Sequence, residues 1–507
     1  MEYSPVSLLW LGLLLPAFLA FLLSRRKPTK LPPQPPAWPV IGNILDLWPA
    51  PHRNLHSFRA EHGPVTWLKL GSLNTMVIQS AQAAAEFFKG HDLAFADRKC
   101  PHALTALGYD QGSLAFGRYG SYWRVLRRLC SAELLVNKRI NETAHLRQKC
   151  ADSVIAYVEE EVAAKRATIE QGIDLSHFLF LLTFNVMGNM VLSRDLLDPQ
   201  SKDGPEFFDA MNRVMEWAGK PNVSDFTPWL RWWDPQGIKA GMTKDMGRAM
   251  KIAEGFVKER LEERKLGGET RATKDFLDAM LDYEGDGKEG PPKISLQNVN
   301  VIILEMFFAG AESTSSTIEW MMAELLRQPE SMKKAKDELD QVVGLNGKLE
   351  ESGTEKMPFL QAVVKETLRL HPPVPLLLPR NTLKETNFMG FDIPKDTMVY
   401  VNAWGIGRDP DAWEDPLAFK PERFLGSNID YKGQNFELIP FGSGRRMCVG
   451  LSLAHRVLHL ALASLLYRFD WELGSGLTPE TLDMRERSGI TLRMLHPLKV
   501  IPKKRSA

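Results

Sequence analysis

The sequence predicts a mainly helical protein with small β-sheets, built as one large domain. Two apolar stretches of helical length, residues 295–328 and 451–466, carry most of this prediction. Apolar and polar residues alternate over residues 65–78, which predicts a β-hairpin, and helical patterns dominate after it. No internal repeat or long linker divides the 507 residues after about residue 40, so we expect a single body.

The charge balance and the cysteine count exclude several classes of protein. The chain has 63 basic and 62 acidic residues, whereas a chain that binds nucleic acid usually carries a basic excess. We therefore expect no nucleic-acid partner. Four cysteines are too few for a disulfide framework in a chain of this length, and no Cys-x-x-Cys pair suggests zinc. Free thiols favour a reducing compartment.

The N-terminus contains an uninterrupted apolar segment, residues 6–23. As a helix it would span about 27 Å, close to the hydrocarbon core of a bilayer. Arg25, Arg26 and Lys27 follow it directly, and such a basic flank stays in the cytosol. A cleaved secretory signal would have its charges before the apolar run. Residues 1–24 therefore predict a retained membrane anchor, with the rest of the chain in the cytosol.

A basic flank and a proline-rich connector occupy residues 25–43. Proline restricts φ and favours an extended, stiff chain. We expect this hinge to orient the large domain, residues 44–507, relative to the membrane.

Two helices are predicted after the hairpin, over residues 81–89 and 121–135. In the second helix, Trp123 and Arg127 are four residues apart and share a face. An indole N–H and a guanidinium could converge there on one anion. Residues 205–250 are rich in aromatic and methionine side chains, and such side chains more often build a core than bind a ligand.

The helix predicted over residues 295–328 begins after Ser295, a good N-cap, and ends before Pro329. Its middle contains a glycine, an acid and two hydroxyls, which are locally unfavourable in a helix. These residues are Gly310, Glu312, Ser313 and Thr314. The pattern indicates either a functional site or a kink against a close neighbour.

Another helix is predicted over residues 358–371, with Glu366 and Arg369 on one face. Arg423 could share the Glu366 carboxylate. Residues 372–380 lead into a strand, and residues 488–493 are predicted to form a strand of a terminal hairpin.

The segment of residues 441–450 holds a cysteine in a glycine-rich loop directly before a helix. Backbone N–H groups and the helix dipole at such a position favour a thiolate, which is a soft ligand for a transition metal. Five positions of the loop resemble the haem-binding loop of the cytochrome P-450 family: Phe441, Gly444, Arg446, Cys448 and Gly450. The resemblance covers essentially the whole chain and implies the P-450 fold.

The resemblance implies a role for each motif. Cys448 would bind the haem iron. Trp123, Arg127 and Arg380 would meet the haem propionates, and Leu376, Leu377, Leu378 and Ile490 would line the substrate pocket. Residues 309–314 resemble the oxygen-activating motif, in which Ala309 and Gly310 lie against haem and Glu312, Ser313 and Thr314 relay protons to dioxygen. Ser313 stands where most members have threonine. Glu366, Arg369 and Arg423 resemble the structural lock of the family.

Cofactors and partners follow from the same resemblance. We expect haem b, a small apolar substrate and O2, with electrons from NADPH through a separate NADPH-cytochrome P-450 reductase, because the chain has no Gly-x-Gly-x-x-Gly unit. Cytochrome b5 is a further expected partner. The anchor and hinge resemble those of plant microsomal members, which implies the endoplasmic reticulum membrane with the catalytic domain facing the cytosol.

Within the plant members, the sequence is most similar to the group that oxidises geraniol-type monoterpenoids and iridoids. That group also includes hydroxylases of phenolics and alkaloids, which remain an alternative. A haem-thiolate isomerase or dehydratase would need no reductase, but such enzymes tend to lack the acid-plus-hydroxyl pair present at Glu312 and Ser313. The same pair argues against a non-catalytic haem carrier.

Overall fold

A computed structural model of the chain describes residues 30–164, 171–197, 204–266, 274–285, 290–344, 347–474 and 476–505. The predicted membrane anchor, residues 1–24, lies outside the described residues, as does the start of the hinge. The helices are α2 Pro51–His62, α3 Ala81–Ala85, α4 Tyr109–Gly112, α5 Ser121–Leu129, α6 Asn137–Glu142, α7 Ala144–Ala164, α8 Leu175–Leu192, α9 Gly204–Gly219, α10 Val223–Phe226, α11 Ile238–Lys265, α12 Phe276–Leu281, α13 Leu296–Arg327, α14 Pro329–Val343, α15 Pro358–Leu370, α16 Ala403–Ile406 and α17 Leu451–Arg468.

The strands are short and form small sheets, as predicted. They are β1 Val65–Leu70, β2 Leu73–Ile78, β3 Ile173–Asp174, β4 Arg380–Asn381, β5 Thr386–Phe388, β6 Phe391–Ile393, β7 Met398–Val401, β8 Phe469–Leu473, β9 Glu486–Arg487, β10 Arg493–Met494 and β11 Lys499–Lys504. The largest sheet has the order β1-β2-β7-β4. The hairpin predicted over residues 65–78 is confirmed, with Leu70 paired to Leu73 across the turn.

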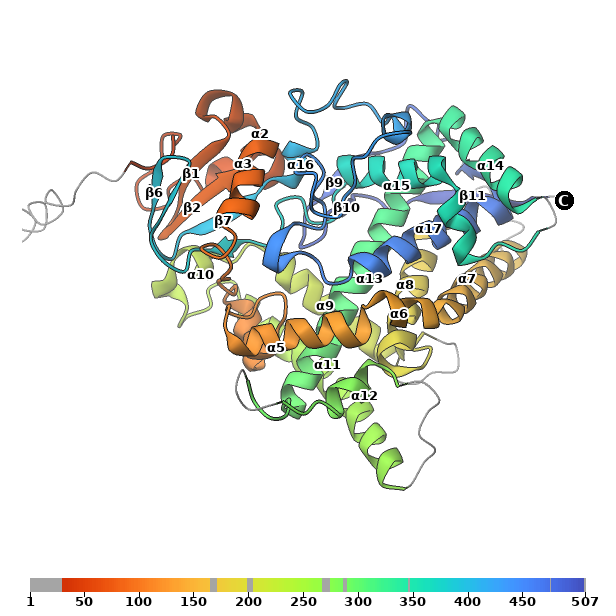
Figure 1. Cartoon of the computed structure of the whole chain (residues 1–507), viewed down its shortest axis with the longest axis horizontal. Helices are drawn as coiled ribbons and strands as arrows, with labels where there is room; N and C mark the ends of the chain where they lie inside the picture. The colour runs from red at the N-terminus through yellow and green to blue at the C-terminus, as the bar shows by residue number, and fades with distance from the viewer. Residues whose placement is uncertain are drawn as a thin grey trace, which may run out of the picture.

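Helix α13 runs through the centre of the molecule, and the sheet of β1, β2 and β7 lies at one end (Figure 1). The Ser295 hydroxyl caps α13 by accepting a bond from the Asn298 N–H, as predicted. Helices α8, α11 and α17 pack around α13. Among the described residues, only α8 is long and apolar enough to cross a membrane, but it is a core helix because 78% of it is buried.

The predicted lock is confirmed. Arg369 donates from Nε and Nη2 to the two oxygens of Glu366, each at 2.7 Å, and the Arg423 Nε donates to Glu366 at 3.1 Å. All three groups are buried or nearly so, and a buried pair with complete hydrogen bonding fixes how α15 meets the segment that contains Arg423.

Two local predictions are wrong, one for residues 488–492 and one for Leu376. Residues 488–492 form the loop between β9 and β10 rather than a strand. This loop is held by tertiary bonds instead of a ladder: the Leu492 N–H donates to the Pro373 carbonyl at 2.8 Å, and the Ser316 hydroxyl donates to the Leu492 carbonyl at 2.9 Å. Leu376 packs into a core cluster with Leu55 and Leu68 and does not line the pocket.

Candidate active site

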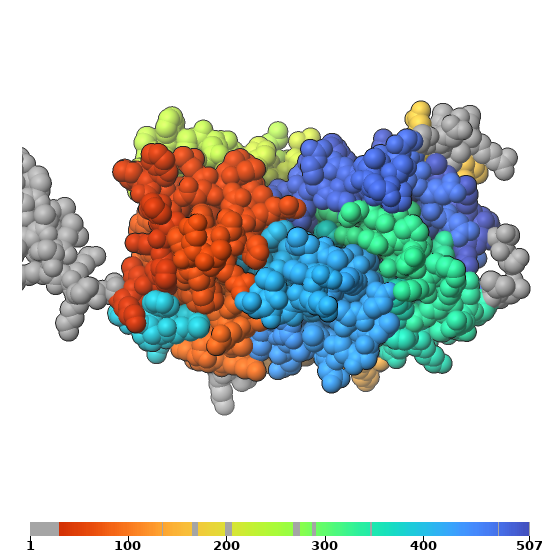
Figure 2. All heavy atoms as spheres, turned by 90° about the horizontal axis from the view of Figure 1, so that it is seen from above, coloured from red at the N-terminus to blue at the C-terminus, as the bar shows by residue number. Residues whose placement is uncertain are grey.

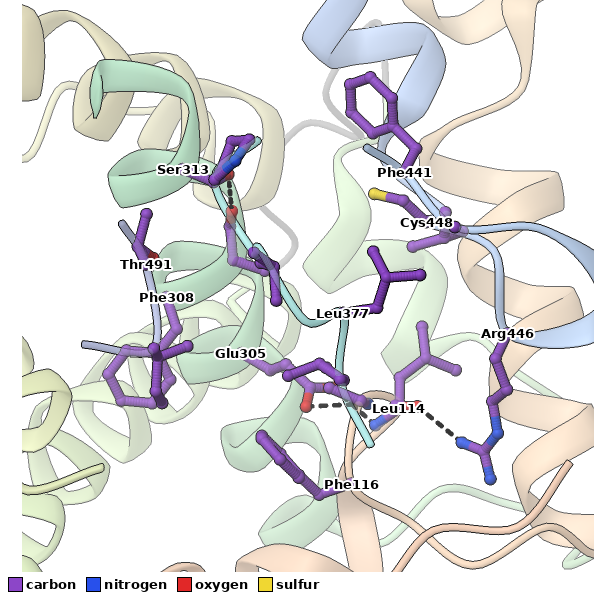
Figure 3. A pocket seen from close by; sticks show the side chains of 18 of the residues that line it. Leu114, Phe116, Glu305, Phe308, Ser313, Leu377, Phe441, Arg446, Cys448 and Thr491 are labelled. Carbon is purple, nitrogen blue, oxygen red and sulfur yellow. Dashed lines mark hydrogen bonds between the residues drawn. The ribbon is translucent and has the colours of Figure 1, made fainter. Parts of the chain in front are cut away.

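A cavity of about 280 Å³ lies between α13 and the loop that contains Cys448 (Figure 3). Its walls come from α5, α9, α13, the segments 113–116 and 373–380, and the loop between β9 and β10. Most of the predicted site residues line it: Trp123, Arg127, Ala309, Ser313, Thr314, Arg380, Phe441, Arg446 and Cys448. Leu377, Leu378 and Ile490 line it as well, as expected. Segments from several separate parts of the sequence therefore form one site.

The Cys448 loop is shaped by glycine. Gly442 and Gly444 have φ values of 68° and 69°, a left-handed conformation that favours glycine. The turn lets the Cys448 N–H donate to the Phe441 carbonyl at 2.9 Å, directly before α17. The thiol is thereby turned into the cavity, beside the Phe441 ring (Figure 3).

The protein groups alone do not favour a thiolate at Cys448, contrary to the expectation from the helix dipole. Burial of the thiol at the cavity raises the pKa of Cys448, and the Gly450 N–H and the charge of Arg127 lower this pKa by less. A bound metal cation would reverse this balance, since a coordinating thiol loses its proton outright.

Four arginines line one edge of the cavity: Arg98, Arg127, Arg380 and Arg446. Of these four arginines, only Arg380 has a carboxylate partner among the described residues, Asp92 at 3.2 Å. The Nε of Arg98 is buried and has no hydrogen-bond partner. Burial, together with the neighbouring Arg380, lowers the pKa of Arg446 to about 9. A cationic edge of this kind is completed by an anion.

Trp123 and Arg127 do not converge on one anion as the sequence predicted. The Trp123 indole N–H donates to the Leu114 carbonyl at 2.8 Å, and the Arg446 guanidinium lies over the Trp123 ring at 3.9 Å. Leu114 lies nine residues before Trp123 in the sequence, whereas Arg446 lies 332 residues after Leu114. Arg127 is therefore the member of the pair that is left to meet an anion in the cavity.

The centre of α13 separates its hydroxyls from its acid. Ser313 lines the cavity, and its hydroxyl donates back to the Ala309 carbonyl at 2.6 Å, a bond that is drawn in Figure 3. Glu312 does not line the cavity and forms an ion pair with Arg493 on β10. Burial raises the pKa of Glu312, and Arg493 lowers it in part. One Glu312 oxygen, Oε2, is buried without a partner.

Three predicted glycines lie outside the cavity wall. A Cβ at Gly310 would lie 2.5 Å from the Met187 Sδ on α8, so this glycine permits close helix packing. A Cβ at Gly444 would collide with the Asp92 carboxylate. Gly450 directs its N–H toward the Cys448 sulfur. Their roles are to shape the backbone around the site.

Arg98 and Glu305 line the cavity and were missed from the sequence. Arg98 is buried, and its Nη1 donates to the Leu378 and Pro379 carbonyls. Glu305 is a single charged residue within an apolar stretch of α13, residues 301–308, and that isolation was the available signal.

The cavity fits haem, a flat and largely apolar ring with an iron and two propionates. Apolar side chains such as Leu114, Phe308 and Leu377 form its walls, the arginines form one edge, and a single thiol points into it. Thiolate ligation favours oxygen-activating chemistry at haem iron. The fold and the cavity together define the class of haem-thiolate enzymes.

Comparisons with known proteins agree with this class. Residues 32–499 match the family model "Cytochrome P450", and the chain belongs to this family. A zebrafish cytochrome P450 structure with progesterone superposes with a TM-score of 0.74 at 27% identity, covering 90% of this chain and all of that one. The protein is therefore a haem-containing monooxygenase.

Plant enzymes are among its similar relatives. The chain is 56% identical to the iridoid oxidase of Catharanthus roseus, over 95% of this chain and 93% of the relative. It is 41% identical to the geraniol 8-hydroxylase of the same plant, over 99% of both chains. The 7-ethoxycoumarin O-deethylase of Helianthus tuberosus is 40% identical, over 97% of both.

Proposed function

We propose that the protein inserts one atom of O2 into a monoterpenoid or iridoid. The observation that carries this proposal is a cavity beside Cys448 whose lining, outside the cationic edge, is mainly aliphatic and aromatic. Such a lining suits a compact apolar substrate. The names of the relatives, an iridoid oxidase and a geraniol 8-hydroxylase, agree with it. The coumarin deethylase among the relatives keeps a phenolic substrate as the second candidate.

Cys448 is the proposed iron ligand. Haem, when bound, supplies the iron centre that activates O2. Arg98, Arg127 and Arg380 would neutralise its propionates, while Trp123 and Arg446 support that edge through the Leu114 carbonyl. Phe441, Gly444 and Gly450 hold the loop that presents the thiol. Ala309 would let α13 lie close to the ring, whereas Gly310, which was predicted to bind haem, lets α13 pack against α8.

Glu312, Ser313 and Thr314 are the proposed proton-delivery residues. Ser313 and Thr314 reach the cavity, whereas Glu312 is held on the other side of α13 by Arg493. For a proton to pass, the Ser313 hydroxyl has to leave the Ala309 carbonyl and turn into the cavity. Water between Glu312 and Ser313 would complete the path.

The proposed electron source is NADPH, through a separate flavoprotein reductase, with cytochrome b5 as a further partner. Residues 1–24 would anchor the chain in the endoplasmic reticulum membrane, and residues 25–43 would connect the anchor to the catalytic domain, residues 44–507, in the cytosol.

Replacement of the thiol tests the ligand assignment. The Cys448→Ala variant should lose the thiolate-type Soret shift of the reduced carbon monoxide complex, together with NADPH-dependent product formation. The matched control is Cys130→Ala, because Cys130 is a buried free thiol that does not line the cavity. A normal thiolate spectrum in Cys448→Ala would show that another residue binds the iron.

A further inference from the structure

Glu305 on α13 is a buried carboxylate in the wall of the cavity. It accepts four hydrogen bonds. The donors are the Tyr109 hydroxyl at 3.1 Å, the Ser113 hydroxyl, the Leu114 N–H at 2.6 Å and the Ala115 N–H at 3.0 Å. All four donors come from α4 and the segment that follows it, which lie 190 to 196 residues from Glu305 in sequence.

These bonds hold one continuous piece of the cavity wall, residues 113–116. Leu114, Ala115 and Phe116 all line the cavity. Ser113 extends the network, since its hydroxyl donates to Glu305 and accepts from the Phe116 N–H at 2.8 Å. The conformation of this segment therefore depends on a single carboxylate from the facing helix.

The backbone of Leu114 joins the wall to the cationic edge. Its N–H donates to Glu305, and its carbonyl accepts from the Trp123 Nε1 at 2.8 Å and from the Arg446 Nη1 at 3.2 Å. Figure 3 shows Glu305 and Arg446 reaching Leu114 from opposite sides. A displacement of Leu114 would therefore disturb its bonds to Glu305 on one side and to Trp123 and Arg446 on the other.

The carboxylate is costly to bury. Burial raises the pKa of Glu305, and the bonds from Ser113, Ala115, Leu114 and Tyr109 lower it only in part. A buried charge is stabilised by such donors, and hydrogen bonds to a charged group are stronger than neutral ones. A neutral side chain would have served as a simple apolar wall, so the charge points to a need for a rigid segment.

We propose that Glu305 is a positioning residue that holds residues 113–116 as a preformed wall of the substrate cavity and links this wall to the cationic edge. The inference rests on the proposed function, because the wall would orient the substrate of that reaction. Glu305 acts through residues 113–116 and is not proposed to contact the reacting atoms.

Glu305→Gln is the informative variant. It keeps the shape of the side chain but removes the charge and places an amide N–H group where an acceptor is needed. The matched control is Glu319→Gln, because Glu319 is a buried carboxylate on the same helix that accepts a backbone bond from the Leu498 N–H and does not line the cavity. Ser113→Ala, which removes one donor and keeps the carboxylate, is a second variant in case Glu305→Gln does not fold.

Amide hydrogen exchange of the holoenzyme measures whether the loop is held. In Glu305→Gln, the peptide that covers residues 113–117 should exchange about 10- to 100-fold faster, as the loss of charge-assisted bonds predicts. Ser113→Ala should accelerate the same peptide by less, and Glu319→Gln should leave it unchanged. Equal exchange in Glu305→Gln and the parent would overturn the proposal.

Two azoles that bind haem iron measure whether the wall is preformed. Imidazole is too small to need the wall, whereas 4-phenylimidazole has to pack its ring against it. In Glu305→Gln, the dissociation constant from the Soret shift should rise about tenfold for 4-phenylimidazole and change less than about twofold for imidazole, because the wall must then be ordered on binding. Equal changes for both azoles would contradict the proposal, as would altered azole binding without faster exchange, which would indicate direct ligand contact.

A failure here is distinguishable from a failure of the proposed function. The carbon monoxide spectrum of the Cys448 variants tests haem-thiolate ligation, and it should be normal in Glu305→Gln and Glu319→Gln. A normal spectrum with an unaltered loop would remove the role of Glu305 and leave the proposed function standing.

Discussion

Ser313, the proposed donor of a proton to the cavity, is small and is bonded to its own helix. Its hydroxyl lies 2.6 Å from the Ala309 carbonyl. Serine lacks the γ-methyl that restricts threonine at χ1, so it can turn either to the helix backbone or to the cavity. We infer a proton path that works but is only part of the time in the delivering conformation.

The first prediction concerns the coupling of NADPH use to product formation. Ser313→Ala should increase peroxide per product several-fold, because the Ser313 hydroxyl no longer delivers the proton. Ser313→Thr should reduce peroxide, since the extra methyl restricts the side chain. NADPH, peroxide and product are measured in one reaction. Ser315→Ala is the control, because the Ser315 hydroxyl bonds to the Glu312 carbonyl and does not line the cavity. If Ser313→Ala matches the parent, Thr314 or water carries the proton.

At the level of elements, α13 is positioned by its contact with α8. Gly310 meets Met187 there, and the Thr183 hydroxyl on α8 donates to the Ala311 carbonyl at 3.0 Å. The glycine is therefore explained by helix packing. The cavity is lined by its neighbours Ala309 and Ser313, because α8 and the cavity lie on different faces of this turn.

Gly310→Ala should destabilise the protein by about 1–3 kcal/mol, because the new Cβ overlaps a buried methionine and overpacks the interface. Alanine itself favours a helix by about 1 kcal/mol, so the cost of Gly310→Ala should become smaller when it is measured in a Met187→Ala background, where the overlap is absent. The control is Gly255→Ala on α11, where a Cβ meets nothing within 4 Å and stability should rise slightly. Midpoints of urea unfolding measure these changes. A stabilised Gly310→Ala would contradict the packing explanation.

Helix α5 presents basic side chains next to the Cys448 loop. Arg124, Arg128 and, on α6, Lys138 are exposed, while Arg127 on the same helix faces the cavity. Attraction between exposed charges steers a partner and is weakened by salt. This face is therefore the expected docking site for an acidic surface of the reductase.

Reversing two charges on this face should slow reduction by the reductase several-fold at low salt and weaken its salt dependence. The variant is Arg124→Glu with Lys138→Glu. The same change of charge at exposed lysines of α11, Lys251→Glu with Lys258→Glu, is the control. Stopped-flow reduction under carbon monoxide measures the rate. Equal rates in the parent and the α5 variant at low salt would place the docking surface elsewhere.

At the level of the whole molecule, two segments far apart in sequence form one exposed apolar face. The end of the hinge and the start of the catalytic domain expose Trp38, Val40, Leu45 and Trp48, and the region from α10 onward exposes Val223, Trp229, Trp232 and Trp233. The turn between β1 and β2 joins them, since the Gly71 N–H donates to the Ile41 carbonyl and the Ser72 N–H donates to the Phe226 carbonyl. Figure 2 shows the two regions, red and yellow-green, side by side.

This face predicts membrane binding in addition to that of the proposed anchor, because exposed tryptophans settle at the lipid–water interface. Protein that lacks residues 1–24 should still bind phosphatidylcholine vesicles, and Trp232→Ser with Trp233→Ser should weaken that binding at least about tenfold. Leu417→Ser with Leu425→Ser, two exposed leucines outside the face, should not. Co-sedimentation measures the bound fraction. Unaltered binding in the double tryptophan variant would show that another surface meets the lipid.

Local patterns were sufficient to predict much of this protein. The hairpin and the helices that begin near Ser121, Ser295, Pro358 and Leu451 depend on neighbours in sequence, and the structure confirms them. The Cys448 loop was predicted because its glycines and its following helix are contiguous with the thiol. The segment of residues 488–492 was not, because distant partners, Pro373 and Ser316, replace a strand ladder.

Tertiary contacts decided how the motifs meet. The pairing of Glu312 with Arg493 turns the acid away from the cavity, and the Leu114 carbonyl takes the indole N–H of Trp123. The four donors to Glu305 lie 190 to 196 residues away from it in sequence. Such partners bond because folding brings them within about 3 Å and removes water, which leaves a buried polar group no other partner. No local pattern carries that information, so only the folded chain shows it.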